Sequence, residues 1–488
     1  MIWVLTIDWA GTRWAWASGS LPDGAGASVV RRMEGPGWAW DAPQAGDPPA
    51  PPDGVSLELA WPEVAALEAE GHRLESAVAE LAVLQTGDAW ADRDVVYQGP
   101  IVGGEYGGPG EAVALQLRPA PWEDSGLLLQ PSQQVGEDTW AIDGSEGRGY
   151  PLVIGKPGVY QRSDGTSDTL SGAPCLPVGG DLLVVACHRV AATSLEVYSP
   201  TDDASETFAI SYQFDDAGQQ VAVVDLSAAA TIFSDTSYSY YGIWEDGGLS
   251  LEDGTPLETA GEVIAWALRQ SSLEVDAAAL AAIQAPLAGF RLAGFIDAPC
   301  SPWDWLQREV LPLLPVALLQ GPRGIRPALW RPPSASLATD SLSVDRGEVA
   351  RDGRITRIGN PLNDMTIRYA WSARTGQYYR SRRRAAGGNI CSEVAQRSAE
   401  MLGPKVGPTL ETQWVYDLLT ADRILLSQME MRQPRRQVAL VGTLSRLRFL
   451  RPLDCVLFSS SALALSDIPA IVRRVEWGAV DARLILEF

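Results

Sequence analysis

Alternating apolar and polar positions dominate the first 125 residues of the chain. Residues 2–8 and 12–18 alternate around Gly11, which predicts a β-hairpin with Trp14 and Trp16 on one face. Further strands are predicted at residues 74–84, 94–102 and 112–117. Antiparallel strands spaced this closely favour a small barrel or sandwich.

Helical spacing and turn residues interrupt this pattern. Residues 61–71 have the spacing of a short helix, and the Pro- and Gly-rich, acidic stretch 35–54 is predicted to be a loop. Residues 131–149 resemble a polar connector, after which Asp, Gly and Ser turns separate a second group of strands. Those strands are predicted at residues 182–190, 195–198, 208–214 and 221–226.

The pattern becomes helical after about Ser234. Residues 260–269 place their apolar side chains on one face, and Asp276 is a candidate N-cap for an alanine-rich helix that reaches about residue 283. Ser301 followed by Pro302 predicts another helix start, which Pro312 should end early. Later strands are predicted at residues 355–357, 365–371, 378–380, 411–416, 437–441, 454–459, 471–477 and 482–488, with helices at 391–402 and 420–432.

These elements predict a mainly β protein with α/β parts. We expect two barrel-like domains, at residues 1–130 and 351–488, with a β-rich insert at 131–233 and an α/β domain at 234–350 between them. The chain of 488 residues is long enough for several domains with their own cores. Strand-rich regions at both ends suggest two related barrels.

Composition and charge narrow the possible partners. The chain is 46% hydrophobic and 20% charged, which excludes a wholly disordered protein. Its net charge of −23 is uneven: residues 1–300 hold 12 Lys and Arg against 43 Asp and Glu, whereas residues 301–488 hold 26 against 18. Stable nucleic-acid binding by the acidic part is therefore not expected, and the basic part could contact an acidic partner or another copy.

The search for reactive or targeting motifs gives negative results. No phosphate-binding loop, serine nucleophile motif or zinc-binding HExxH occurs, and the Asp and Glu pairs lie in predicted turns. Five cysteines without CxxC spacing and two distant histidines, His72 and His188, suggest neither disulfides nor a metal site. We therefore predict no catalytic residue, no metal, no cofactor and no enzyme activity. A signal peptide and a membrane span are not expected.

Two residue groups allow more than one interpretation. The 18 tryptophans, among them Trp3, Trp266, Trp305, Trp371 and Trp477, either fill cores and subunit interfaces or form sugar-stacking platforms. The basic run at residues 380–384 is either a solvated loop or an anchor on an acidic partner. Its arginines are the candidate interface residues Arg380, Arg382, Arg383 and Arg384.

Several short segments of the last third follow one another in a recognisable order: ITR at 355–357, NPLND at 360–364, TLE at 409–411, Trp414, Tyr416, TAD at 420–422, LDCV at 453–456 and the strand at 471–477. In this order they resemble segments of the central tail-tip or baseplate hub of tailed bacteriophages and gene transfer agents. Residues 93–117, 150–155 and 302–314 resemble earlier hub segments more loosely.

The resemblance implies a structural virion protein, made in the host cytoplasm and located at the tail tip. It implies a homotrimeric ring, with two barrels per subunit, that joins the tail tube to the tip proteins and forms a channel for DNA ejection. Partners would be a distal tail ring protein, the tape measure and tip or fibre proteins, with only transient passage of DNA. Acidic residues of the first 300 would line that channel or else cover the outer surface. The alternative is a carbohydrate-binding or carbohydrate-active virion or secreted protein.

Overall fold

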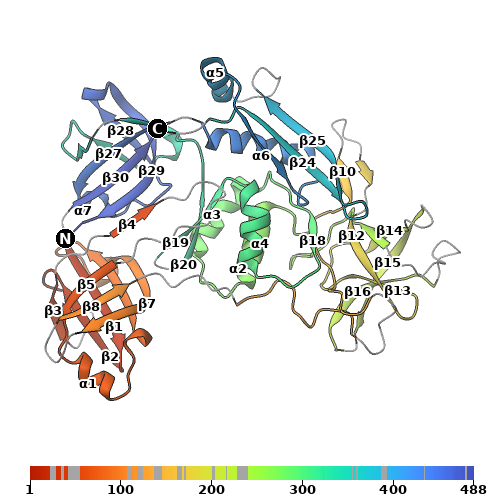
Figure 1. Cartoon of the computed structure of the whole chain (residues 1–488), viewed down its shortest axis with the longest axis horizontal. Helices are drawn as coiled ribbons and strands as arrows, with labels where there is room; N and C mark the ends of the chain where they lie inside the picture. Colours follow the sequence, from red (N-terminus) through yellow and green to blue (C-terminus); the bar gives the residue numbers. More distant parts are fainter. Residues whose placement is uncertain are drawn as a thin grey trace.

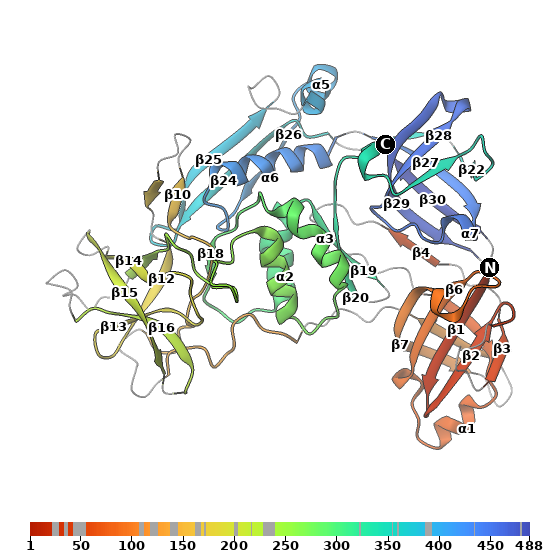
Figure 2. The same ribbon diagram turned by 180° about the vertical axis from the view of Figure 1, so that it is seen from behind.

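The fold is described from a computed structural model and is mainly β, as predicted. Two curved sheets built from the two ends of the chain lie side by side, a helical centre follows, and a small closed barrel lies at the far end (Figure 1). Figure 2 shows the same order from behind. The structure describes residues 1–21, 29–33, 38–41, 55–106, 112–117, 125–136, 145–161, 167–169, 172–199, 204–215, 217–227, 240–321, 324–353, 355–358, 361–385, 393–433, 435–478 and 481–488.

The N-terminal sheet has seven strands and begins with the predicted hairpin. Its strands, in spatial order, are β3 (Val29–Arg32), β2 (Thr12–Ala17), β1 (Ile2–Trp9), β6 (Val78–Leu84), β7 (Asp94–Tyr106), β8 (Ala112–Leu117) and β5 (Val55–Ala60). The β1–β2 turn has positive φ at both Ala10 (51°) and Gly11 (74°). Such two-residue turns match the twist of paired strands, so this local geometry fixes the register.

Arg31 bridges the two edge strands of this sheet. Its guanidinium donates to both carboxylate oxygens of Glu63 at 2.6 and 2.7 Å and to the carbonyl oxygen of Ala60, at the end of β5, at 3.3 Å. Glu63 immediately precedes the short helix α1 (Val64–Ala69), which confirms the predicted helix. A side chain from β3 therefore connects the sheet across its seam, where no strand pairing joins β3 to β5 in the described residues.

A six-stranded closed barrel occupies the middle of the chain. Its strands are β12 (Ala173–Val178), β13 (Leu182–Ala186), β14 (Ser194–Ser199), β15 (Ala204–Phe214), β16 (Gln220–Asp225) and β17 (Tyr240–Ile243), preceded by the short pair β10 (Val159–Gln161) and β11 (Ser167–Thr169). β17 closes the barrel by pairing with both β12 and β14, and it lies beyond the boundary predicted at residue 233. Hereafter we call β12–β17 the closed barrel.

The helical centre begins at three side-chain caps, of which the sequence indicated two, Asp276 and Ser301. Thr259, Asp276 and Ser301 each accept a hydrogen bond from backbone N–H groups of the following turn. They begin α2 (Ala260–Gln270), α3 (Ala277–Leu287) and α4 (Pro302–Trp305), the last continuing as a π-helical turn (Leu306–Val310). Around them lie the pairs β9 (Leu152–Ile154) with β18 (Gly294–Ile296) and β19 (Val316–Gly321) with β20 (Gly324–Leu329).

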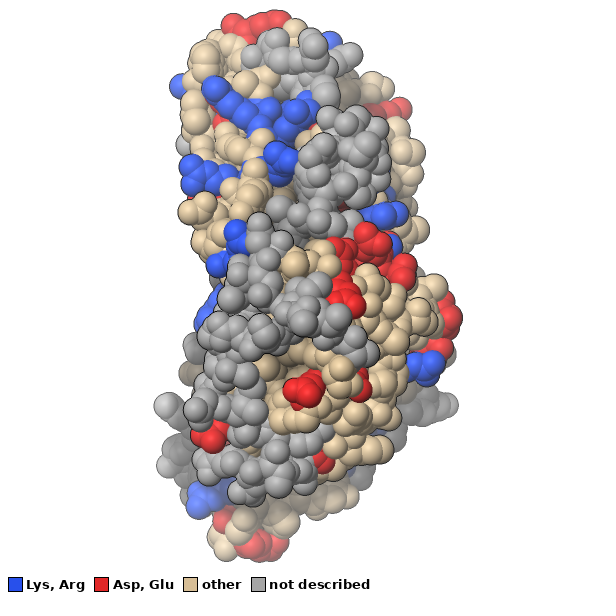
Figure 3. Space-filling view, turned by 90° about the vertical axis from the view of Figure 1, so that its right-hand side faces the viewer, with Lys and Arg blue, Asp and Glu red and all other residues tan. Residues whose placement is uncertain are grey.

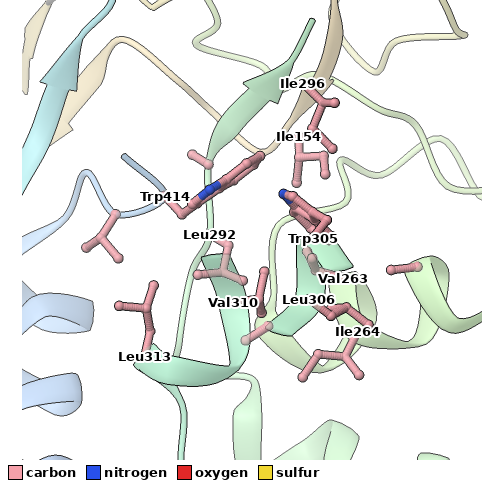
Figure 4. Packing of buried hydrophobic residues seen from close by; sticks show 14 of the residues in the cluster. Ile154, Val263, Ile264, Leu292, Ile296, Trp305, Leu306, Val310, Leu313 and Trp414 are labelled. Atoms are coloured by element: carbon pink, nitrogen blue, oxygen red, sulfur yellow. The ribbon is translucent and has the colours of Figure 1, made fainter. Parts of the chain in front are cut away.

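Trp305 and Trp414 meet edge to face in the core of this centre. Their ring centroids lie 5.0 Å apart, and apolar side chains from α2, the π-helical turn, β9 and β18 surround them (Figure 4). The indole Nε1 of Trp414 donates to the Glu309 carboxylate at 3.1 Å, which satisfies its buried N–H group. This core connects the helices to the last third of the chain.

A three-stranded sheet covered by one helix follows. It consists of β25 (Gln377–Ala385), β24 (Asp364–Ser372) and β26 (Val406–Glu411) in that order, with α5 (Glu393–Leu402) and α6 (Leu418–Met431). The strand predicted at residues 411–416 is wrong, because the strand ends at Glu411. Trp414 and Tyr416 follow the end of this strand and are buried in a core formed with α4 and β24.

The C-terminal sheet receives a strand from the other end of the chain. Its strands are β21 (Asp340–Ser343), β28 (Cys455–Ser460), β29 (Leu465–Trp477), β30 (Asp481–Glu487), β27 (Arg435–Thr443) and β22 (Val349–Arg351), with β23 (Thr356–Ile358) beside β27 and helix α7 (Leu444–Leu447). β4 (Trp38–Asp41) pairs antiparallel with β29 from Arg474 to Trp477. The prediction of a loop throughout residues 35–54 is therefore wrong, since β4 forms only against a distant strand.

No described helix combines the length and apolar character that crossing a bilayer requires.

Candidate assembly surfaces

Reactive groups are not clustered in the described residues. No group of three or more His, Cys, Asp or Glu is placed there to share a metal ion. Burial raises the pKa of the Cys187 thiol to about 12 and that of Cys175 further still, so both thiols stay neutral and are poor nucleophiles. Cys391 lies outside the described residues.

His188 has a structural role between two elements. Its Nε2 accepts a hydrogen bond from the backbone N–H of Val153 in β9 at 2.9 Å, and its Nδ1 lies 2.9 Å from the carbonyl oxygen of Arg189. Both contacts fit the neutral ring with its proton on Nδ1. Burial lowers the pKa of His188 to about 4, so the ring connects the closed barrel to β9 in its uncharged form.

The described tryptophans mostly lie in cores. Trp61 is buried in the N-terminal sheet, where the rings of Trp9, Trp14 and Trp16 lie 5.3, 5.5 and 4.8 Å from it. Trp3, Trp305 and Trp477 are also buried, whereas Trp266 and Trp371 are half-buried. These positions support the core interpretation and give the carbohydrate alternative no support.

The two sheets from the chain ends share one hydrophobic core. A single cluster contains Leu81 and Val83 of β6 together with Val456 of β28 and Val475 of β29. Figures 1 and 2 both show these sheets in direct contact, with the N-terminus at their junction. The two barrel-like units therefore form one packed body rather than two units on a flexible linker.

Buried and half-buried charges lie at the same junction. Arg451 Nη2 donates to both carboxylate oxygens of Asp94 at 2.7 and 2.8 Å, and its guanidinium carbon lies 5.8 Å from the ring of Trp477. Arg448 is buried and lies 3.6 Å from Asp88. No motif in the sequence pointed to these residues, because each pair joins positions that are distant along the chain.

The basic run at residues 380–384 is a strand, the second half of β25, rather than a loop. Arg382 Nε donates to Asp422 of α6 at 2.7 Å, and Arg384, which is buried, also pairs with Asp422. Arg383 points to the opposite face, where it pairs with Asp364 at 2.5 Å and lowers the pKa of that carboxyl group. Period-two alternation thus separates the run into an inner and an outer set.

The outer set belongs to an open sheet face, which we call the outer face. Strand register places Arg383 opposite Thr366 and Ser381 opposite Arg368, and Thr366 is also paired with Thr409. Arg368 Nη1 donates to Glu411 at 2.9 Å. Tyr379, two residues before Ser381, completes this face. Arg380 is exposed but lies on the α6 side by alternation, opposite Tyr369.

Comparison with known proteins gives no family assignment. No protein-family model matches the chain, and none of the curated proteins compared with it matches. Among solved structures, the chain is similar to the 43 kDa tail protein of prophage MuSo2 from Shewanella oneidensis, with 8% identity, a TM-score of 0.39 and coverage of 99% of this chain and 98% of that one.

Two further solved structures show weaker similarity. Prophage tail protein gp18 from Listeria monocytogenes EGD-e has 9% identity and a TM-score of 0.26, over 67% of this chain and 93% of that one. A chain of the virion of a native gene transfer agent particle has 15% identity and a TM-score of 0.18, over 50% of this chain and 78% of that one. Scores this low do not establish a shared fold, so the functional conclusion rests on the chain's own structure.

Proposed function

We propose that the protein is a structural component of a phage-like tail, the central hub of its tip or baseplate. The observation that carries this proposal is the pairing of two barrel-like sheets from the two chain ends through one shared core and the strand β4. The sequence resemblance to such hubs supports it independently.

The paired sheets suit a ring at a change of symmetry. Three copies with two barrel-like units each would present six similar units to a sixfold tail tube while keeping threefold symmetry for the tip proteins. The partners would be a distal tail ring protein, the tape measure and tip or fibre proteins. A shared core would keep both units of each copy in fixed register around the ring.

The ring would surround a channel for DNA. A duplex carries one negative charge per ~1.7 Å, so acidic walls would repel it and leave it free to slide. The net charge of −31 on residues 1–300 is the reason for placing acidic side chains on the channel wall. An acidic outer surface that only aids solubility is the competing arrangement, and an image of the assembled ring separates the two.

The decisive experiment measures mass and shape together. Light scattering coupled to size exclusion should give three times 52.4 kDa, and negative-stain averages should show a threefold ring with a central hole. A monomer at every concentration tested, together with no ring in purified particles, would contradict the proposal.

A further inference from the structure

We infer that the α6 side of β25 holds a site for a small oxyanion, such as phosphate or a carboxylate group, at Arg382 and Arg384. The site lies on the side of the sheet opposite the outer face, and it does not depend on the trimer of the proposed function. Two arginines meet one aspartate there, so one positive charge is left without a partner charge.

Asp422 of α6 is shared by both arginines. Nε and Nη2 of Arg382 donate to its two carboxylate oxygens at 2.7 and 3.4 Å, and Nη2 of Arg384 pairs with the same carboxylate. Guanidinium groups stay protonated at physiological pH. Two positive charges and one negative charge therefore give this group a net charge of +1.

The excess charge is shielded from water. The side chains of Arg384 and Asp422 are only 6% and 14% exposed, and the buried Nε of Arg384 has no hydrogen-bond partner among the described residues. The residues opposite the two arginines on β24, Met365 and Ile367, are apolar and buried. A buried charge without a counter-charge is strongly unfavourable, so an anion bound beside this group would stabilise it.

The acids near Asp422 in the sequence of α6 do not supply the missing charge. Asp417 caps the helix by accepting from the N–H group of Thr420 at 2.7 Å, and Glu430 lies more than two turns beyond Asp422. The positions three and four residues before and after Asp422 are all leucine. In the part of the chain that the structure describes, Asp422 is the one carboxylate that pairs with either arginine. A ligand is therefore needed to balance the charge.

Arg382 gives an anion access to this group. Its side chain is 32% exposed, and Asp422 engages Nε and only one of its two terminal nitrogens. The planar guanidinium fork matches the oxygens of phosphate and carboxylate groups, which favours an oxyanion over chloride. Figure 3 shows Lys and Arg gathered over the upper part of the molecule at this end, and such a concentration of positive charge attracts anions from solution.

The test measures phosphate binding by the full chain. The melting temperature of the wild type should rise and level off with increasing sodium phosphate, because a ligand that binds only the folded state stabilises it. Sodium chloride at the same ionic strength should produce no such plateau. Arg382→Gln leaves the neutral pair of Arg384 and Asp422, so it should weaken phosphate binding at least about tenfold in titration calorimetry.

Arg368→Gln is the matched control, because it changes the net charge by the same amount on the outer face, where Glu411 already balances Arg368. It should bind phosphate as the wild type does. A wild type without a plateau, or equal phosphate binding by Arg382→Gln and the wild type, would overturn the inference.

The source of the oxyanion is found by comparing phosphate binding with assembly. If Arg382→Gln loses phosphate binding and also weakens the trimer, the site is filled by a carboxylate of a neighbouring chain. If it loses phosphate binding and leaves the trimer unchanged, the ligand is a free ion. A wild-type protein that binds phosphate but never forms a trimer would support this inference while contradicting the proposed function.

Discussion

Arg451 donates two hydrogen bonds, of 2.7 and 2.8 Å, to the carboxylate of Asp94, although the two residues are 357 positions apart in the sequence. The pair joins the C-terminal sheet to β7 of the N-terminal sheet, beside their common apolar core. Its side chains are mostly shielded from water, so it should be stronger than an ordinary surface ion pair.

A double-mutant cycle should measure this coupling. Arg451→Ala and Asp94→Ala should interact by about 1.5–3 kcal/mol in urea unfolding, because charged hydrogen bonds shielded from solvent lie in that range. The exposed pair Arg13 and Asp8 serves as the control and should give about 0–1 kcal/mol. Additive effects at the junction would show that the two sheets are held by apolar packing alone.

Replacement of Trp61 should strongly destabilise the core of the N-terminal sheet. Trp61→Ala removes the ring that three other tryptophans contact and should cost about 3–5 kcal/mol of unfolding free energy. Trp61→Phe should cost clearly less, since the buried Nε1 of Trp61 has no hydrogen-bond partner to lose. Equal losses of unfolding free energy for both variants would contradict this prediction, because they would mean that a smaller aromatic ring restores none of the contacts of Trp61.

Acid should weaken the contact between the closed barrel and β9 through His188. Because its native pKa is about 4, below the ordinary 6.5, the unfolded chain binds the proton more readily. Stability is therefore fully present above about pH 6.5 and falls as the pH drops toward 4, by at most about 3 kcal/mol. Urea unfolding between pH 4 and 7 should show a shallower pH dependence for His188→Gln, while exposed His72→Gln should follow the wild type.

The arginines of the basic run should differ in how much they contribute to the free energy of unfolding. Arg384→Ser leaves Asp422 with Arg382 alone in a buried setting and should lower the free energy of unfolding by about 2 kcal/mol. Arg380→Ser, at an exposed position, should change it by less than about 0.5 kcal/mol. If the two variants unfold at the same urea concentration, the inner position of Arg384 has no energetic consequence.

Local signals in the sequence were sufficient for elements whose interactions are local. The first hairpin follows from alternation around Gly11, and α3 follows from Asp276, which accepts from the N–H groups of Ala278 and Ala279. In each of these elements the interacting residues lie within a few positions of one another along the chain. The local sequence pattern therefore contains the interactions that form the element.

Elements that depend on distant partners could not be predicted. Trp414 and Tyr416 are aromatic residues of the kind found in strands, yet they lie outside a strand and fill a core formed with α4 and β24. The spacing of apolar residues cannot distinguish a buried strand from a buried segment without strand pairing. The direction of each arginine in the run depends on β24 and α6 beside it. The outer face could not be predicted either, because it depends on the strand register that places Arg368 opposite Ser381.

The pairing of β4 with β29 has a consequence for how the chain is made. All the other N-terminal strands lie within the first 117 residues, so their sheet can form early on the ribosome while β4 still lacks its partner. At ~5–20 residues per second, β29 emerges on the order of 20–90 s later. Completion of the C-terminal sheet therefore waits until β29 and β30 have been synthesised, and a chain released before β29 would expose β4 without its partner strand.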